Sequence, residues 1–124
     1  MKYYYNNQKL RTSDNTYTHA VVTIDANGNA NLWCCCGRYD LAIKRYNIEI
    51  SNTIKVKAMY DQNIKDIDNG AYLEWAFDAN GKWCRCEKLN DEQLAKARQD
   101  YVREIERCER IIKTLKVIEL EARQ

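Results

Sequence analysis

The stretch Leu89-Asn90-Asp91-Glu92-Gln93-Leu94 begins the element that decides the predicted fold, a long C-terminal helix. Asn90 is a favourable N-cap, Gln93 stands at the third helical position, and the two leucines can form a hydrophobic staple. From there an apolar residue recurs every seven positions, at Leu94, Tyr101, Cys108, Leu115 and Ala122. This spacing predicts a helix with one continuous apolar side.

The length of this helix sets the expected assembly. Residues 91–124 would span about 51 Å as one helix, whereas a compact domain of 124 residues is only about 35 Å across. Either the helix stops near Lys113 and residues 115–120 form a last strand, or it overhangs and needs a partner. A seven-residue repeat favours pairing with a second copy, the alternative being packing on the protein's own sheet. We expect a single domain over 1–124 with a β-rich body over 1–90, a helix over 91–124, and a homodimer or higher oligomer through that helix.

Two hairpins are predicted upstream, around a repeated tetrapeptide. Asp-Ala-Asn-Gly occurs at 25–28 and at 78–81, each time shortly before Trp-Cys-x-Cys. The flanking runs are rich in β-branched and aromatic residues, which indicates strands over 17–25 and 31–36, and over 71–77 and 82–86. Asn-Gly favours a tight turn in which both central residues have positive φ. We expect both hairpins, with a further strand at 2–5, to belong to one small antiparallel sheet.

Helical spacing appears once more, between the two hairpins. Tyr39, Ile43, Tyr46 and Ile50 predict one short helix of about three turns. Residues 54–58 then alternate like a strand, and residues 60–70 are polar and turn-prone. The predicted fold class is therefore α+β, with a small antiparallel sheet built from hairpins, one short helix and the long C-terminal helix.

Charge and residue usage exclude several classes of protein. There are 20 Lys and Arg against 18 Asp and Glu, a formal net charge of +2, which is too balanced for a general nucleic-acid coat. The one histidine, His19, falls in a predicted strand, and the four glycines build no phosphate-binding loop. No apolar run has the length of a signal peptide or a membrane span. These features predict a cytoplasmic protein that is not an enzyme, with no catalytic residues, no cofactor, and neither a membrane nor a nucleic acid as partner.

The cysteines allow two interpretations. Cys34 and Cys36 share one face of a predicted strand, as do Cys84 and Cys86. Four thiolates would converge on zinc if the two strands were neighbours, but structural zinc sites use a C-x₂₋₄-C chelate on a tight turn. We therefore expect these cysteines to act as small buried hydrophobes and predict no metal site, with zinc at these four as the open alternative.

Basic and aromatic residues supply candidates for an anionic ligand. Lys96, Arg103, Arg107 and Arg110 share one side of the predicted helix, away from its apolar stripe. Like charges at this spacing favour an anionic counterpart, and the alternative is pairing with nearby carboxylates. Arginine for phosphates and aromatic faces for bases together suit a nucleotide.

Several segments together resemble a known family. They are Tyr-Tyr-Tyr-Asn at 3–6, Lys-Leu-Arg-Thr-Ser at 9–13, Tyr-Thr-His-Ala-Val-Val at 17–22, a β-rich body, and the capped helix. The combination resembles the first Thoeris anti-defence family of phages of low-GC bacteria, over the whole length in organisation but without a diagnostic motif. The resemblance implies a non-enzymatic sponge in the host bacterial cytosol. Such proteins bind cyclic ADP-ribose isomers made by TIR proteins, at a homodimer interface built from the sheet and the C-terminal helices.

Under that interpretation six residues are the candidate ligand contacts. Arg11, Arg103 and Arg107 would hold pyrophosphate, Asn90 would hydrogen-bond a base or ribose, and Phe77 or Trp83 would stack on adenine. Two other functions remain open. The chain can be a phage inhibitor that binds a host defence protein such as a CRISPR effector, or a plain assembly protein whose helix merely pairs.

Overall fold

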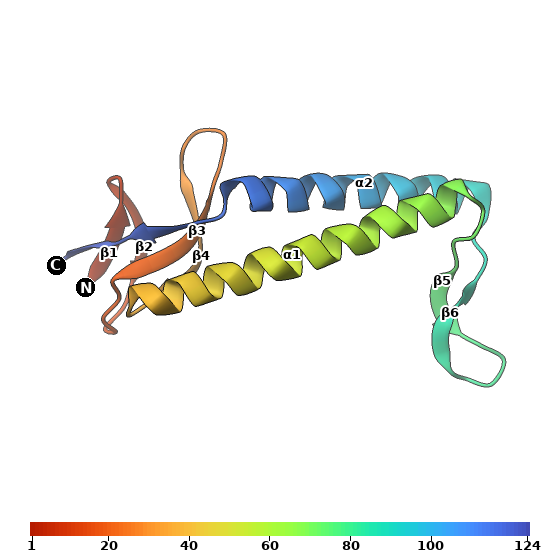
Figure 1. The fold of residues 1–124 in the computed structure, drawn as a ribbon, viewed down its shortest axis with the longest axis horizontal. Coiled ribbons are helices and arrows are strands. Elements are labelled where there is room, and N and C mark those ends of the chain that lie inside the picture. Colours follow the sequence, from red (N-terminus) through yellow and green to blue (C-terminus); the bar gives the residue numbers. More distant parts are fainter. The chain divides into compact units, whose positions relative to one another are not determined.

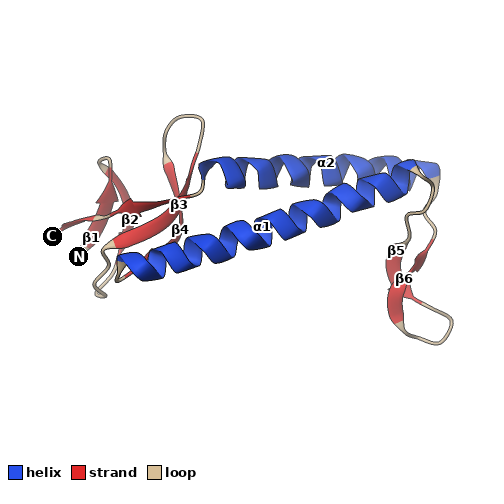
Figure 2. Ribbon diagram, in the orientation of Figure 1, coloured by secondary structure: helices blue, strands red, loops and turns tan.

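The computed structural model describes all residues 1–124, and it contains two helices and eight strands (Figure 1). The chain divides into two compact units. The terminal unit combines Met1–Ile54 with Glu109–Gln124, and the central unit is Lys55–Cys108. Each unit contains helix and antiparallel strands, so the α+β class is confirmed (Figure 2). Neither of the two helices contains an apolar stretch of membrane-spanning length.

The terminal unit contains two three-stranded antiparallel sheets. One has the order β2-β1-β8, formed by Gln8–Thr12, Lys2–Tyr5 and Glu121–Arg123. The other has the order β4-β3-β7, formed by Ala30–Cys36, His19–Ile24 and Lys116–Glu119. The predicted strands at 2–5, 17–25 and 31–36 are therefore confirmed, but the expected single sheet is wrong, because β1 belongs to a different sheet from β3 and β4.

The turns of this unit differ from the expected ones. Asn6 and Asn7 both have positive φ (47° and 64°), so they close the β1–β2 hairpin with a turn that the sequence pattern did not predict. At 25–28 the prediction of two positive φ angles is wrong, because only Gly28 (φ 81°) adopts one. There the Asp25 carboxylate accepts hydrogen bonds from the backbone N–H groups of Asn27 and Asn29, both at 2.9 Å, and so holds a wider loop.

The core of the terminal unit lies on both faces of β3. Ala20 and Val22 point to one face and pack with Ala30 and Ile118. Val21 points to the other and packs with Ala42 and Leu115. Because successive residues of a strand face opposite sides, β3 is a continuous apolar run rather than an alternating one.

The side chain of Gln8 joins the two sheets. Its Nε2 donates to the backbone carbonyl of Ala30 at 2.7 Å, and its Oε1 accepts from the backbone N–H of Ala30 at 2.8 Å. Ala30 is only 4% exposed, so water cannot readily replace these two bonds.

We expect Gln8→Ala to lower the free energy of unfolding by about 1–3 kcal/mol, since it leaves two buried backbone groups without partners. Urea unfolding of the purified chain measures this change. Lys9→Ala is the control, because Lys9 is the exposed neighbour and makes no such bond. Equal stability of the two variants would contradict the role assigned to Gln8.

Helix α1 is much longer than predicted and covers Tyr39–Asp68. The expected strand at 54–58 and the expected turn at 60–70 are both wrong. No proline or glycine interrupts residues 39–68, and the polar residues support the helix through (i, i+4) pairs such as Lys57–Asp61 at 3.1 Å. The helix ends at Asp68 and is capped by Gly70 (φ 73°) in a Schellman motif, in which the N–H of Ala71 donates to the Asp66 carbonyl and the N–H of Gly70 donates to the Ile67 carbonyl.

Helix α2 covers Asp91–Thr114, so the expected helix over 91–124 is wrong in its second part. The alternative, a helix that stops near Lys113 and is followed by a strand, matches β7. At the start, Asn90 Oδ1 accepts from the Gln93 N–H at 2.8 Å and Gln93 Oε1 accepts from the Asn90 N–H at 3.0 Å, which confirms the capping box. The predicted apolar stripe is partly covered within the chain, because Leu115 lies in the core and Cys108 is buried.

The central unit holds the second predicted hairpin. Strands β5 (Glu74–Phe77) and β6 (Trp83–Glu87) form a two-stranded antiparallel sheet. This hairpin is confirmed, but it does not share a sheet with the first one. Within the same unit, α1 and α2 contact each other through the Tyr60 and Tyr101 rings, 5.5 Å apart, and through the Arg98–Asp68 ion pair at 2.8 Å.

Candidate functional site

One side of the β5–β6 hairpin carries three large exposed aromatic side chains and one partly exposed arginine. Phe77 pairs with Trp83 and Trp75 pairs with Arg85 across the two strands. Directly paired residues, and residues two apart on a strand, project to the same side. We call these four residues the aromatic face.

The rings of the aromatic face contact one another. Phe77 and Trp83 meet edge to face with centroids 5.0 Å apart, and Trp75 stacks on Trp83 at 6.2 Å with an interplanar angle of 18°. Such cross-strand aromatic pairs stabilise a two-stranded hairpin, which is marginal alone. The structure thus brings together two predicted ligand residues, Phe77 and Trp83.

The rings remain open to solvent despite these contacts. Phe77 is 69% exposed, Trp83 55% and Trp75 45%. Figure 1 shows why: β5 and β6 extend away from the ends of the helices that they connect. Contiguous exposed aromatic surface next to an arginine is typical of a binding site rather than of packing.

Arg85 places a positive charge at the edge of the aromatic face. Its guanidinium lies 5.6 Å from the Trp75 ring centroid and 5.5 Å from that of Tyr72, and its Nη1 donates to the Leu73 carbonyl at 3.2 Å. Neither Trp75 nor Arg85 was among the predicted ligand residues. Their positions two residues from Phe77 and Trp83 are the signal that would have identified them.

Tyr72 anchors the hairpin inside the central unit. It is 4% exposed, its hydroxyl donates to Glu74 Oε2 at 3.0 Å, and the same hydroxyl contacts that of Tyr101 at 2.5 Å. Burial, with the Tyr101 and Glu74 contacts, raises the pKa of Tyr72 far above its ordinary value of 10.0. The neutral phenol is therefore the form that the folded chain favours.

We expect the stability of the chain to fall as the pH rises above about 10, because the unfolded chain then loses the Tyr72 proton that the folded chain retains. Tyr72→Phe removes this proton and should make the fall shallower. Urea unfolding at several values between about pH 9 and pH 11 measures the slope. Tyr39→Phe is the control, since Tyr39 is 58% exposed, and it should keep the wild-type slope. Identical slopes in all three chains would refute the assignment.

Three further predicted ligand residues lie on or beside α2 in the central unit. Asn90 is the N-cap, and capping occupies its Oδ1. Arg103 and Arg107 are one helical turn apart, and their Nη1 atoms lie 3.7 Å from the carboxylates of Asp100 and Glu104. That distance exceeds a hydrogen bond, and the two side chains are 68% and 62% exposed, so both guanidinium groups can turn to an anionic ligand.

Arg11, the sixth predicted ligand residue, belongs to the terminal unit. It lies in β2 and pairs with Tyr3. Its guanidinium stacks over the Tyr17 ring at 5.2 Å. Arg11 is exposed, and the contact with Tyr17 accounts for its orientation.

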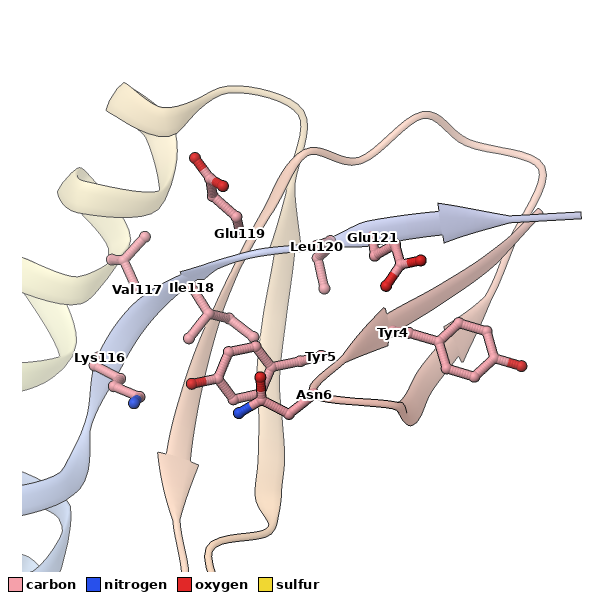
Figure 3. A pocket seen from close by; sticks show the side chains of 9 residues that line it. All are labelled: Tyr4, Tyr5, Asn6, Lys116, Val117, Ile118, Glu119, Leu120 and Glu121. Atoms are coloured by element: carbon pink, nitrogen blue, oxygen red, sulfur yellow. The ribbon is translucent and has the colours of Figure 1, made fainter.

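The terminal unit also contains a shallow groove of about 510 Å³ (Figure 3). It opens where β1 turns away from the last segment of the chain, and its lining consists of Tyr4, Tyr5, Asn6 and residues 116–121. The Lys116 amine lies 5.5 Å over the Tyr5 ring. A second hollow, of about 280 Å³ in the central unit, includes Leu89 and Asp91 on the two sides of Asn90 in sequence. Neither hollow is lined by any of the six predicted ligand residues.

The cysteines do not form the four-thiolate site considered as an alternative. Strands β4 and β6 belong to different sheets, so the neighbouring strands that it requires are not found. No group of three or more His, Cys, Asp and Glu side chains is arranged to hold a metal ion. Cys34 and Cys36 pack against the cluster of Val21, Ala42 and Leu115, which confirms for this pair the predicted role in packing. Desolvation and the neighbouring Cys34 thiol raise the pKa of Cys36 to about 11.

Comparison with known proteins identifies no relative: no family model, curated protein or solved structure matches the chain.

Proposed function

We propose that the chain binds a nucleotide without transforming it, and that the aromatic face takes the base. The observation that carries this proposal is the exposed contact between Phe77 and Trp83. Rings of this kind give a base a stacking surface worth about 1–3 kcal/mol per base. Arg85 at the edge of the same face supplies a guanidinium group for a phosphate. The exposed Arg103 and Arg107 lie roughly 18–24 Å along α2 from its first residue, so they are proposed only as phosphate contacts separate from the aromatic face.

The finer proposal is a phage anti-defence protein acting in the host bacterial cytosol. It sequesters a cyclic ADP-ribose isomer made by TIR proteins and so removes an immune signal without degrading it. One feature supports a sponge over an enzyme. The one histidine, whose ring contacts Tyr39 at 5.2 Å, belongs to the terminal unit, whereas the aromatic face belongs to the central unit.

A homodimer or higher oligomer through the C-terminal helix, α2, belongs to the same proposal, and α1 offers a further apolar surface for pairing. Within the terminal unit, α1 exposes Leu41 and Ile48, which are 42% and 43% exposed and lie two helical turns apart on one side. Apolar side chains repeated at this spacing suit pairing with a helix of a second copy.

Native mass spectrometry of the chain purified from cells that produce the TIR signal tests both parts of the proposal. The expected result is an oligomer that carries one nucleotide per binding site, released unchanged in mass on denaturation. Release of a ligand with an altered mass would show that the chain is an enzyme and not a sponge. A chain that carries no nucleotide, and binds none in calorimetry, would overturn the proposal.

The second candidate is a phage inhibitor that binds a host defence protein such as a CRISPR effector. The aromatic face favours it too, because exposed tryptophan and arginine are the residues that most often dominate protein interfaces. Co-purification of a host protein that is lost in Trp83→Ala, with no small ligand bound, would select this function over the first.

A further inference from the structure

The side of the β5–β6 hairpin opposite the aromatic face carries two thiols. Cys84 and Cys86 are two residues apart on β6, so they project to the same side. Cys84 Sγ donates to Asp78 Oδ2 at 3.8 Å, and Cys86 Sγ donates to the Ala76 carbonyl at 3.5 Å. The two sulfur atoms thus lie on one side of β6, each oriented by one contact within the hairpin.

This pair differs from the other cysteine pair of the same spacing. Cys34 and Cys36 pack against a hydrophobic core cluster, and that packing explains them. Cys84 and Cys86 belong to neither core cluster, and Cys86 is exposed. Their position on an open two-stranded sheet gives a soft ion direct access to both sulfur atoms.

We propose that Cys84 and Cys86 together form a two-coordinate thiolate site for Cu(I). Thiolate ligands select Cu(I) over harder ions. Cu(I) accepts linear coordination by two ligands, one on each side of the ion, so two thiolates suffice. Structural zinc, in contrast, takes four ligands. Same-face positions on a strand are about 7 Å apart, and the side chains lean together to bridge one ion.

Binding is an exchange of protons for metal. The two thiols release their protons to solvent, two S–Cu bonds form, and copper stays in the monovalent state, so the step needs neither an oxidant nor a reductant. The Asp78 Oδ2 and Ala76 carbonyl contacts are then lost. The Asp78 turn survives this loss, because its Oδ1 accepts from the Asn80 and Lys82 N–H groups at 2.8 and 2.9 Å.

Anaerobic titration of the reduced chain with Cu(I), in competition with bicinchoninate, tests the site. We expect the wild-type chain to retain one Cu(I) and the double variant Cys84→Ser/Cys86→Ser to retain none. The matched control is Cys34→Ser/Cys36→Ser, with the same spacing on β4, and it should retain one. Copper retained by the Cys84/Cys86 variant, or none retained by the wild-type chain, would overturn the proposal.

Mapping of thiol protection in the wild-type chain gives a second test that needs no variant. Alkylation followed by peptide mass spectrometry should show Cys84 and Cys86 protected by one equivalent of Cu(I), while the reactivity of the other four thiols stays unchanged. Protection of any other pair in place of these two refutes the site.

Discussion

Replacing Trp83 by alanine is expected to weaken nucleotide binding by about fivefold to 150-fold, the equivalent of the roughly 1–3 kcal/mol that stacking on an aromatic ring contributes. Trp83 is the residue of choice because it contacts both Phe77 and Trp75, so its loss breaks up the whole stacking surface. Calorimetric titration with a cyclic ADP-ribose isomer measures the change in Kd. Trp83→Phe keeps an aromatic ring at this position and should retain most of the affinity.

The control for this result is Tyr39→Ala. Tyr39 is also an exposed aromatic residue, at 58%, but it belongs to the terminal unit and contacts His19. Its replacement should leave the Kd unchanged. Because the Trp75 and Phe77 contacts also support the hairpin, circular dichroism of each variant should confirm that the fold is kept. A folded Trp83→Ala chain with the wild-type Kd would show that the aromatic face is not part of the ligand site.

Tyr72→Ala is expected to have the largest effect on stability, a loss of about 3–5 kcal/mol, as is usual when a buried aromatic side chain is truncated. The substitution removes the hydrogen bond to Glu74, the contacts with Tyr101 and the ring under Arg85. The hairpin should then separate from the helices of its own unit. Tyr39→Ala should change stability by less than about 1 kcal/mol.

Hydrogen exchange is the appropriate measurement, because a chain of two units need not unfold in one step. We expect the amides of β5 and β6 to lose protection in Tyr72→Ala, while those of β3 keep theirs. Equal protection of β5 and β6 in the variant and the wild-type chain would show that Tyr72 does not anchor the hairpin.

Local signals in the sequence predicted much of the fold. β-Branched and aromatic runs on both sides of Asp-Ala-Asn-Gly identified both hairpins, and the Asn90–Gln93 spacing identified the start of α2. These signals suffice because each acts within a few residues. The turn at Asn6-Asn7 is also a local signal, but neither this turn nor the strand β2 that follows it was predicted.

Long-range packing decided what local signals could not. Ile54 and Val56 alternate like a strand, yet both are exposed on α1. This part of the helix is stabilised by contacts between residues that are distant in sequence, such as Tyr60 with Tyr101. The end of α2 is likewise set by the partner of the next segment, since β7 pairs with β3. A pairing between residues nearly 100 positions apart leaves no local trace in the sequence.

The candidate site, like the fold, was predicted only in part. Phe77 and Trp83 were predicted, and the pairing of β5 with β6 places them in contact. Trp75 and Arg85 were not predicted, although each lies two residues from a predicted ligand residue and so on the same side of its strand. That these two sides form one face depends on the register of β5 with β6, which composition does not reveal. Arg11 was assigned to the same ligand from composition alone, and its contact with Tyr17 offers a structural reason for its presence.

Strands β7 and β8 are synthesised after the strands they pair with, and this order affects folding during synthesis. Residues 55–108 of the central unit are contiguous, so the ribosome delivers all of its strands and helices before the terminal unit is complete. Strands β1 and β3 are made well before their partners β8 and β7, which lie within residues 116–123. Each of these two strands therefore carries an unpaired edge until its partner has been synthesised, and an unpaired edge exposes a nascent chain to misassociation.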